Sequence, residues 1–425
     1  MAYLKRKRYM ETLFLSPFLI LAIAMILGFF MAWGIGANDV ANAMGTSVGS
    51  KALTLKQAVI IAAIFEFLGA FLAGGEVTST IRKGIVDPEI YSNDLNIFII
   101  GMMASLLAAG TWLYIASNRG WPVSTTHSIV GAIIGFVLIT KGVDAVSWSK
   151  VGEIASSWIT SPLISGFLAF IIYISAKKLI LQAKDKIDAA IFYIPFYSFF
   201  VAGVIAQVIA RKGLTHIGFS WNDSEVWAFT ALIALSTALV TSFALRMRRV
   251  SIASKGDIES AFGVLMIVTA CAMAFAHGSN DVANAIGPLA AIFSAVNSND
   301  LSSTSAINPL ILLLGGVGIV LGLATLGHKV IKTVGEKITK LTPSLGFSAN
   351  MATASTVVFA SYLGFPISTT HTLIGGVIGV GLANSAKDID WSSVYRIFAS
   401  WVITIPIGAV FTILFYVFLR VLFGV

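Results

Sequence analysis

Uninterrupted apolar runs recur along this chain, and they restrict its fold more than any other feature. Two of them occupy residues 16–33 and 226–245, and each approaches the roughly 20 residues that cross a bilayer as a helix. The chain is 57% hydrophobic and only 11% charged, whereas an ordinary soluble protein carries about 25% charged residues. Buried helices of soluble proteins keep a polar face, and these runs do not. We therefore predict an all-α polytopic protein of the cell (plasma or inner) membrane.

The positive charge of the chain favours contact with lipid headgroups over contact with nucleic acid. The formal net charge is +8, and the basic residues are spread over short connections such as 5–8, 81–84 and 246–249. No basic patch belongs to a soluble domain, so we expect a lipid bilayer and no nucleic acid as partner. The single cysteine, Cys271, excludes an intramolecular disulfide.

Three blocks of sequence occur twice, about half a chain apart. "NDVANAMG" at 38–45 returns as "NDVANAIG" at 280–287, "WPVSTTHSIVGAIIG" at 121–135 as "FPISTTHTLIGGVIG" at 365–379, and "WSKVGEIASSWITSP" at 148–162 as "WSSVYRIFASWVITIP" at 391–406. The offsets are 242, 244 and 243 residues, so one duplication explains all three. We predict a first repeat over 12–175, a central insert with two transmembrane helices over 176–259, and a second repeat over 260–425.

The number of apolar segments predicts how the two repeats lie in the membrane. We count about 12 segments, with seven crossings between equivalent points of the repeats. An odd number of crossings turns the second copy upside down. Re-entrant hairpins or discontinuous helices around the "STTH" blocks would leave that parity odd. Inverted repeats with broken helices at the midplane are typical of secondary transporters. The absolute orientation stays open, because lysine and arginine are nearly balanced between the two sets of loops.

The duplicated "NDVANA" motif places carboxylates and amides at membrane depth. In each copy, positions i, i+1 and i+4 share one side of a helix. A carboxylate in the membrane is costly and usually functional, and oxygen ligands suit a hard cation such as Na⁺ rather than a transition metal. Alternatively, the asparagines hold helices together by hydrogen bonds. The predicted sodium ligands are Asn38, Asp39, Asn42, Asn280, Asp281, Asn284 and, as an intramembrane cation ligand or proton carrier, Glu66.

The duplicated "P-x-S-T-T-H" block predicts an anion site. The proline favours an extended entry, and the serine after it is a natural N-cap for the apolar helix that follows. Free amides and the positive end of the helix dipole then stand beside three hydroxyls. Simple capping is the alternative reading. The predicted anion ligands are Ser124, Thr125, Thr126, Ser368, Thr369 and Thr370.

The sequence does not favour an enzyme. His127 and His371 lack a Cys, Glu or third His at metal-ligand spacing, so we expect them to orient the hydroxyl turns by hydrogen bonding. A hydrolase would need a nucleophile that we cannot assemble, and an ion channel would need a continuous polar lining. Two aspartates and a phosphate-like anion repel one another in a low-dielectric site. At least two cations must therefore enter with the anion, which predicts cation–anion symport with no bound cofactor.

These motifs resemble the inorganic phosphate transporter (PiT) family. The resemblance rests on "GANDVANAMG" at 36–45, "GSNDVANAIG" at 278–287 and the two "P-x-STTH" blocks, and it covers both halves of the chain. It implies phosphate import with Na⁺ or H⁺, about twelve helices in inverted repeats, and a homodimer. It also implies that Asp39, Asn42, Asp281 and Asn284 coordinate cations, that the hydroxyl residues of both "STTH" blocks bind phosphate, and that Glu66 is an important intramembrane glutamate. One departure is Asn350, which stands where eukaryotic members tend to carry a glutamate.

We favour a Na⁺-coupled phosphate symporter among the readings that remain. The alternatives are the same architecture driven by protons, carrying phosphate or a metal–phosphate complex, and a relative that prefers sulfate. An ion channel is the remote alternative.

Overall fold

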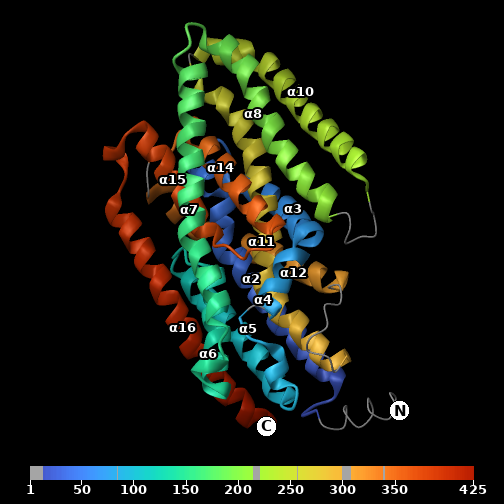
Figure 1. The fold of residues 1–425 in the computed structure, drawn as a ribbon. Coiled ribbons are helices and arrows are strands. Elements are labelled where there is room, and N and C mark those ends of the chain that lie inside the picture. Colours follow the sequence, from blue (N-terminus) through green and yellow to red (C-terminus); the bar gives the residue numbers. More distant parts are fainter. Residues whose placement is uncertain (1–12, 84, 214–220, 256, 299–307, 338–339) are drawn as a thin grey trace.

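The computed structural model describes residues 13–83, 85–213, 221–255, 257–298, 308–337 and 340–425. Over these residues the chain is helical (Figure 1), and its β-structure is an isolated bridge between Val86 and Val146. The α-helices are α2 (Pro17–Gly49), α3 (Leu55–Ala73), α4 (Gly75–Lys83), α5 (Leu95–Asn118), α6 (Thr125–Lys141), α7 (Trp148–Ala176), α8 (Lys186–Val208), α10 (Asp223–Lys255), α11 (Glu259–Ser298), α12 (Pro309–Thr325), α13 (Gly327–Lys337), α14 (Pro343–Tyr362), α15 (Thr369–Asn384) and α16 (Trp391–Phe423). Short 3₁₀ or π turns are η1 (Pro88–Tyr91), η2 (Val143–Ala145), η3 (Lys177–Leu181), η4 (Ile209–Gly213) and η5 (Ala386–Asp388).

Eight helices of the described chain are long and apolar enough to cross a membrane, so this is a multi-pass membrane protein. A ninth span is obtained if α12 and α13 are taken together, although a bend of 66° separates them. The other apolar segments expected from the sequence form the short helices α6 and α15 and the more polar helix α14. The expectation of discontinuous helices is therefore met, and it explains why fewer full spans are seen than the twelve segments counted.

The two motif-bearing helices, α2 and α11, pack against each other and run in opposite directions (Figure 1). Gly28 of α2 faces Leu289 of α11, and Asp39, farther along α2, lies beside His277. Residue numbers therefore increase along α2 in the direction in which they decrease along α11. This antiparallel arrangement supports the predicted inversion of the repeats, which stays a prediction together with their boundaries.

Glycines allow each motif helix to touch a second helix backbone to backbone. A Cβ at Gly36 would overlap the carbonyl of Ile319 on α12, and a Cβ at Gly278 would overlap the carbonyl of Glu66 on α3. Gly36 and Gly278 are equivalent positions of the repeated motif. The same contact is therefore made twice, and it makes Ile319 and Glu66 spatial counterparts.

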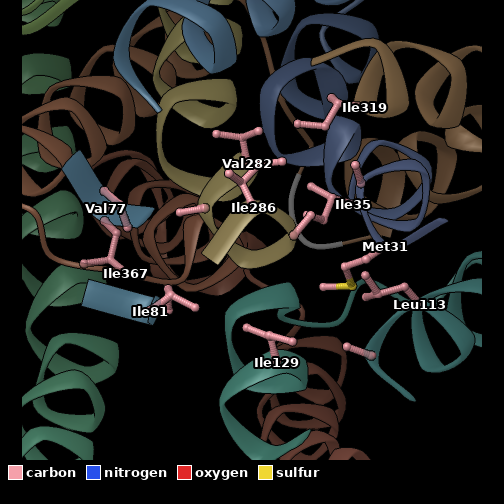
Figure 2. Close-up of a cluster of buried hydrophobic side chains, with 14 of the residues drawn as sticks. Met31, Ile35, Val77, Ile81, Leu113, Ile129, Val282, Ile286, Ile319 and Ile367 are labelled. Atoms are coloured by element: carbon pink, nitrogen blue, oxygen red, sulfur yellow. The ribbon is translucent and has the colours of Figure 1, made fainter. Parts of the chain in front are cut away.

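Buried aliphatic side chains from both halves of the chain surround the motifs. Figure 2 shows Met31, Ile35 and Leu113 near Ile129, with Val282, Ile286 and Ile319 close by. The hydrophobic environment lowers the local dielectric and strengthens every polar interaction at the motifs. The central insert supplies α8 and α10, the two membrane helices expected there, and it packs on the second half through contacts such as Tyr197 with Phe347.

Candidate functional site

The two "NDVANA" motifs lie in the buried middle of α2 and α11. Their six polar side chains are each at most 1% exposed, although they come from segments more than 240 residues apart. The hydroxyl residues of both "STTH" blocks are equally buried. The structure thus brings together all of the predicted sodium and phosphate ligands, Glu66 included, in one interior region.

Helices α6 and α15 begin at this region, as the sequence predicts. The Ser124 hydroxyl accepts the backbone N–H of His127 at 3.2 Å, and Ser368 accepts that of His371 at 3.2 Å. Both serines are therefore N-caps. The rings of the two histidines have centroids 4.5 Å apart, so the two helix starts meet. Two positive dipole ends consequently converge on one place.

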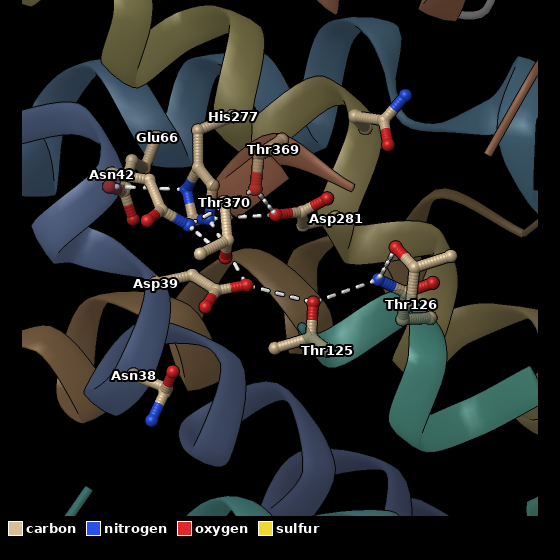
Figure 3. Close-up of polar contacts among 12 residues, drawn as sticks. Asn38, Asp39, Asn42, Glu66, Thr125, Thr126, His277, Asp281, Thr369 and Thr370 are labelled. Atoms are coloured by element: carbon tan, nitrogen blue, oxygen red, sulfur yellow. Dashed lines mark hydrogen bonds and ion pairs between the residues drawn. The ribbon is translucent and has the colours of Figure 1, made fainter. Parts of the chain in front are cut away.

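Each aspartate accepts a hydrogen bond from a threonine of its own half (Figure 3). Thr125 Oγ1 donates to Asp39 Oδ2 at 2.8 Å, and Thr369 Oγ1 donates to Asp281 Oδ2 at 2.6 Å. The two bonds occupy equivalent positions of the duplicated sequence. Each aspartate is thereby joined to a helix start.

The second asparagine of each motif crosses to the other half. Asn42 Nδ2 donates to Thr369 Oγ1 at 3.2 Å and to Thr370 Oγ1 at 2.9 Å. Asn284 Nδ2 donates in the same way to the hydroxyls of Thr125 and Thr126, at 3.2 and 3.3 Å. Neither half is therefore complete alone, because each hydroxyl pair is oriented by both motifs.

The first asparagine of each motif holds the extended segment that precedes a helix start. The Asn38 amide donates to the Trp121 carbonyl at 2.9 Å and accepts the Val123 N–H at 3.0 Å. Asn280 donates to Ser361 and to the Phe365 carbonyl at 3.0 and 3.2 Å. The amides of Asn38 and Asn280 thus take part in helix packing, as the alternative describes, and their ligation of a cation stays a prediction.

His277 is a site residue that the sequence reasoning missed. Its Nε2 lies 2.9 Å from Asp281 Oδ2 and 4.0 Å from Asp39 Oδ2, and its Nδ1 lies 3.3 Å from Glu66 Oε1. A histidine four residues before Asp281 shares its helix face, and this spacing could have identified it. The repeat also offered a signal, because the equivalent position of the first half is Ile35.

The site is symmetric in its aspartates and threonines but not in the residues behind them. His277 and Glu66 form a polar pair on one side, and their counterparts Ile35 and Ile319 are a pair of buried aliphatic side chains. Among the residues that the structure describes, charge-bearing groups therefore stand behind one of the two half-sites and not behind the other. A small ion would meet a different environment on each side.

Several oxygen atoms in this region have no hydrogen-bond partner. Among the described side chains these include Asp39 Oδ1, Asp281 Oδ1, Asn284 Oδ1 and Glu66 Oε2, whereas Glu66 Oε1 faces His277 Nδ1 at 3.3 Å. Ligand atoms of Asp39, His277 and Asp281 lie within 4.8 Å of one another, close enough to surround one ion. Unpartnered buried oxygens are costly unless a cation or proton satisfies them. The carboxylate and amide oxygens of this region fit a hard cation, and the His277 imidazole is a softer neighbour.

The rings of His127 and His371 do not reach the hydroxyls that we expected them to orient. Their Nδ1 atoms lie 3.1 Å from the backbone carbonyls of Trp401 and Trp158, respectively. Each ring also packs on a tryptophan. Only the backbone N–H of each histidine takes part in the hydroxyl turn, through the serine cap. The imidazoles instead attach α6 to α16 and α15 to α7.

Two further polar residues lie around the site, and Asn350 is the one that the sequence singles out. Asn350 accepts a hydrogen bond of 2.6 Å from Thr46, one turn beyond the first motif on α2. Glu76 pairs with Lys212 of the insert at 3.0 Å. Asn350 therefore keeps a polar contact with the motif helix.

Comparison with known proteins agrees with this geometry. Residues 35–412 match the model of the phosphate transporter family. The chain is 48% identical over 411 residues to a putative phosphate permease of Haemophilus influenzae, covering 95% of this chain and 97% of the relative. It is 41% identical over 436 residues to the chloroplast inorganic phosphate transporter 2-1 of Arabidopsis thaliana, covering 94% and 72%. A solved sodium-dependent phosphate transporter superposes with a TM-score of 0.88 at 40% identity, covering 95% of this chain and 99% of that one. The chain belongs to the phosphate transporter family.

Proposed function

We propose that this protein imports inorganic phosphate by symport with Na⁺. One observation carries the proposal: two aspartates and two hydroxyl-bearing helix starts are cross-connected by hydrogen bonds into a single buried site. The site combines groups that suit a cation with groups that suit an oxyanion. The sodium dependence of the structurally similar transporter supports the choice of cation.

Phosphate is held between the starts of α6 and α15 in this proposal. Its ligands are the threonine hydroxyls of both blocks, namely Thr125, Thr126, Thr369 and Thr370, which turn toward phosphate from the protein oxygens to which they otherwise donate. The backbone amides of the two helix starts add donors aligned with the helix dipoles. Ser124 and Ser368 shape these starts by accepting helix amides, and their own O–H groups can still donate to phosphate.

Sodium ions neutralise the carboxylates that would otherwise repel the phosphate. Asp39, Asp281 and Glu66 lie around one histidine, so at most one of three negative charges is offset by the protein. Adding an anion to that cluster is strongly unfavourable in a low-dielectric interior unless cations enter with it. The unpartnered oxygens of Asp39, Asp281 and Asn284 are the ligands we propose, together with the side-chain oxygen of Asn42, and Glu66 adds a negative charge on one side.

His277 gives the proton-driven alternative a specific residue. An imidazole beside three carboxylates could carry a proton in place of a metal cation. No equivalent group stands on the Ile35 side. A proton-coupled mechanism would therefore use one half-site only.

Uptake of labelled phosphate into proteoliposomes tests the proposal. We expect an inward Na⁺ gradient to drive accumulation with a sigmoidal dependence on Na⁺. We expect arsenate, which shares the tetrahedral geometry and protonation of phosphate, to compete more strongly than sulfate. Accumulation that follows a proton gradient and ignores Na⁺ would show that the coupling assignment is wrong.

A pair of variants assigns the roles within the site. Asp281→Asn should raise the Na⁺ concentration for half-maximal uptake by roughly tenfold or more, since one full ligand charge is lost. Ser124→Ala removes a helix cap, so it should cost about 1 kcal/mol of stability and leave the Na⁺ dependence nearly unchanged. The reverse pattern would refute this division of roles.

A further inference from the structure

The His277 imidazole places a nitrogen atom beside the two repeated aspartates (Figure 3). Its Nε2 lies 2.9 Å from Asp281 Oδ2 and 4.0 Å from Asp39 Oδ2. Ligand atoms of the three residues all lie within 4.8 Å of one another. Two ligand atoms that each lie about 2.1 Å from one metal ion are roughly 3 to 4 Å apart. One ion can therefore contact all three side chains after small movements.

Glu66 stands behind the imidazole, where metal sites commonly have a carboxylate. His277 Nδ1 lies 3.3 Å from Glu66 Oε1. A histidine that binds a metal through one ring nitrogen usually donates the N–H of the other nitrogen to a carboxylate or a backbone carbonyl. With the Nδ1 proton directed at Glu66, the lone pair of Nε2 is left for a metal ion on the side of the aspartates. Glu66 is therefore a positioning residue for His277.

The two aspartates are held in place and still offer oxygen atoms to an ion. Thr125 donates to Asp39 Oδ2 and Thr369 donates to Asp281 Oδ2, while the Oδ1 atom of each aspartate has no hydrogen-bond partner. Asp39, His277 and Asp281 are each at most 1% exposed. Ligand carboxylates that are themselves hydrogen-bonded are typical of metal centres. The Oδ1 atoms can bind an ion without breaking a hydrogen bond of the protein.

The nitrogen atom changes which ions this set of ligands prefers. Hard cations such as Na⁺ and Mg²⁺ are bound through oxygen, whereas imidazole suits first-row transition metals. Two carboxylates match the charge of a divalent ion. In the first repeat Ile35 stands at the position equivalent to His277, so the duplication supplies the nitrogen ligand on one side of the site. One such ion per chain is therefore expected.

We propose that Asp39, His277 and Asp281 bind a divalent first-row transition-metal ion, such as Mn²⁺ or Zn²⁺, which competes with Na⁺ for the two aspartates. Binding of the metal ion does not depend on phosphate transport, whereas the competition rests on the Na⁺ ligands of the proposed function. Zn²⁺ binds more tightly than Mn²⁺, in the usual order of affinities for such ligands, and Mg²⁺ binds more weakly than either.

Electron paramagnetic resonance of Mn²⁺ tests the site without transport. Free Mn²⁺ gives a six-line spectrum whose intensity falls when the ion is bound by protein. Detergent-purified protein is titrated with Mn²⁺ in phosphate-free choline chloride. We expect one Mn²⁺ per chain, released by Na⁺, and by Zn²⁺ at a lower concentration than by Mg²⁺.

Variants of the ligand and of its positioning residue locate the bound ion. His277→Gln should weaken Mn²⁺ binding by about tenfold or more, since it removes the nitrogen ligand. Glu66→Met, which removes the acceptor for Nδ1, should weaken it by roughly 10- to 100-fold. Glu66→Gln keeps a carbonyl acceptor and should restore part of the affinity. His127→Gln changes another buried histidine, whose Nδ1 faces the Trp401 carbonyl, and should bind Mn²⁺ as the wild type does.

The outcomes separate the metal site from the proposed function. Loss of Mn²⁺ binding in a His277→Gln protein that Na⁺ still stabilises against heat would support the site, because such a protein is folded. Equal Mn²⁺ binding by His277→Gln and the wild type, or no saturable binding by the wild type, would overturn it. Mn²⁺ that depends on His277 but is not released by Na⁺ would refute the shared aspartates. Binding of Mn²⁺ through His277 by a protein that takes up no phosphate would support the site and refute only the proposed function.

Discussion

At the scale of single residues, the least symmetric position of the site is His277. It lies between Asp281 and Glu66, while the first half has Ile35 at the same place. An imidazole beside carboxylates compensates part of their charge and also fills space that a cation would use. Substitution of this residue therefore changes the cation site without removing a carboxylate.

We expect His277→Gln to bind Na⁺ more tightly than the wild type. The amide supplies an oxygen and no positive charge, so the carboxylate cluster becomes more attractive to a cation. If affinity rises about tenfold, saturating Na⁺ adds about 1.4 kcal/mol of stabilisation, a shift on the order of 2 °C in the thermal midpoint. The measurement is the difference in unfolding temperature of detergent-purified protein with and without NaCl, with choline chloride replacing it.

His127→Gln serves as the matched control for this change. His127 is also buried, but its ring nitrogen lies beside a backbone carbonyl. Its substitution should lower stability without altering the Na⁺-dependent shift. A smaller shift in His277→Gln than in the wild type would mean that the imidazole helps to hold the cation.

At the scale of helices, the geometry of the site depends on two close contacts made by equivalent glycines. Gly36 lets α2 touch α12, and Gly278 lets α11 touch α3. The second contact places Glu66 behind His277. Because helix backbones meet there without side chains between them, the spacing of the ligands is set by these contacts.

Gly36→Ala should disrupt the fold, whereas a second glycine-to-alanine change should not. The new Cβ at Gly36 would overlap the Ile319 carbonyl, so α2 and α12 must move apart, at a cost of roughly 2 kcal/mol or more. Gly263 on α11 has no atom within 4 Å of the corresponding position. Its alanine variant should be neutral or up to about 1 kcal/mol more stable. Thermal unfolding and monodispersity in detergent distinguish the two, and equal behaviour would contradict the proposed role of the contact.

At the scale of the whole molecule, much of the fold and of the site could be predicted because the motifs that determine them occur twice in the sequence. The all-helical class, the serine caps at Ser124 and Ser368 and the assembly of both motifs follow from repeated patterns with a local physical meaning. His277 could not be found from the residues that the two repeats share, because it stands at a position where the repeats differ. The packing of α5 with α16 could not be predicted, since the residues that it brings around one cavity, such as Arg119 and Arg396, are far apart in sequence.

The net charge of the cargo yields the last prediction. Carboxylates fixed in the protein are present whether or not substrate is bound, so the charge moved per cycle depends on what enters with phosphate. Two Na⁺ with monoanionic phosphate carry one net positive charge, and an inside-negative potential then contributes about 2.3 kcal/mol per 100 mV. That corresponds to a roughly 50-fold gain in accumulation.

Potassium diffusion potentials set with valinomycin test this dependence of phosphate accumulation on the membrane potential, and vesicles without the ionophore are the control. Raising the pH should weaken the effect, because phosphate then enters as the dianion and two Na⁺ only balance its charge. Uptake that ignores the potential at low pH would require one Na⁺ per phosphate, and the proposed entry of two Na⁺ would then be wrong.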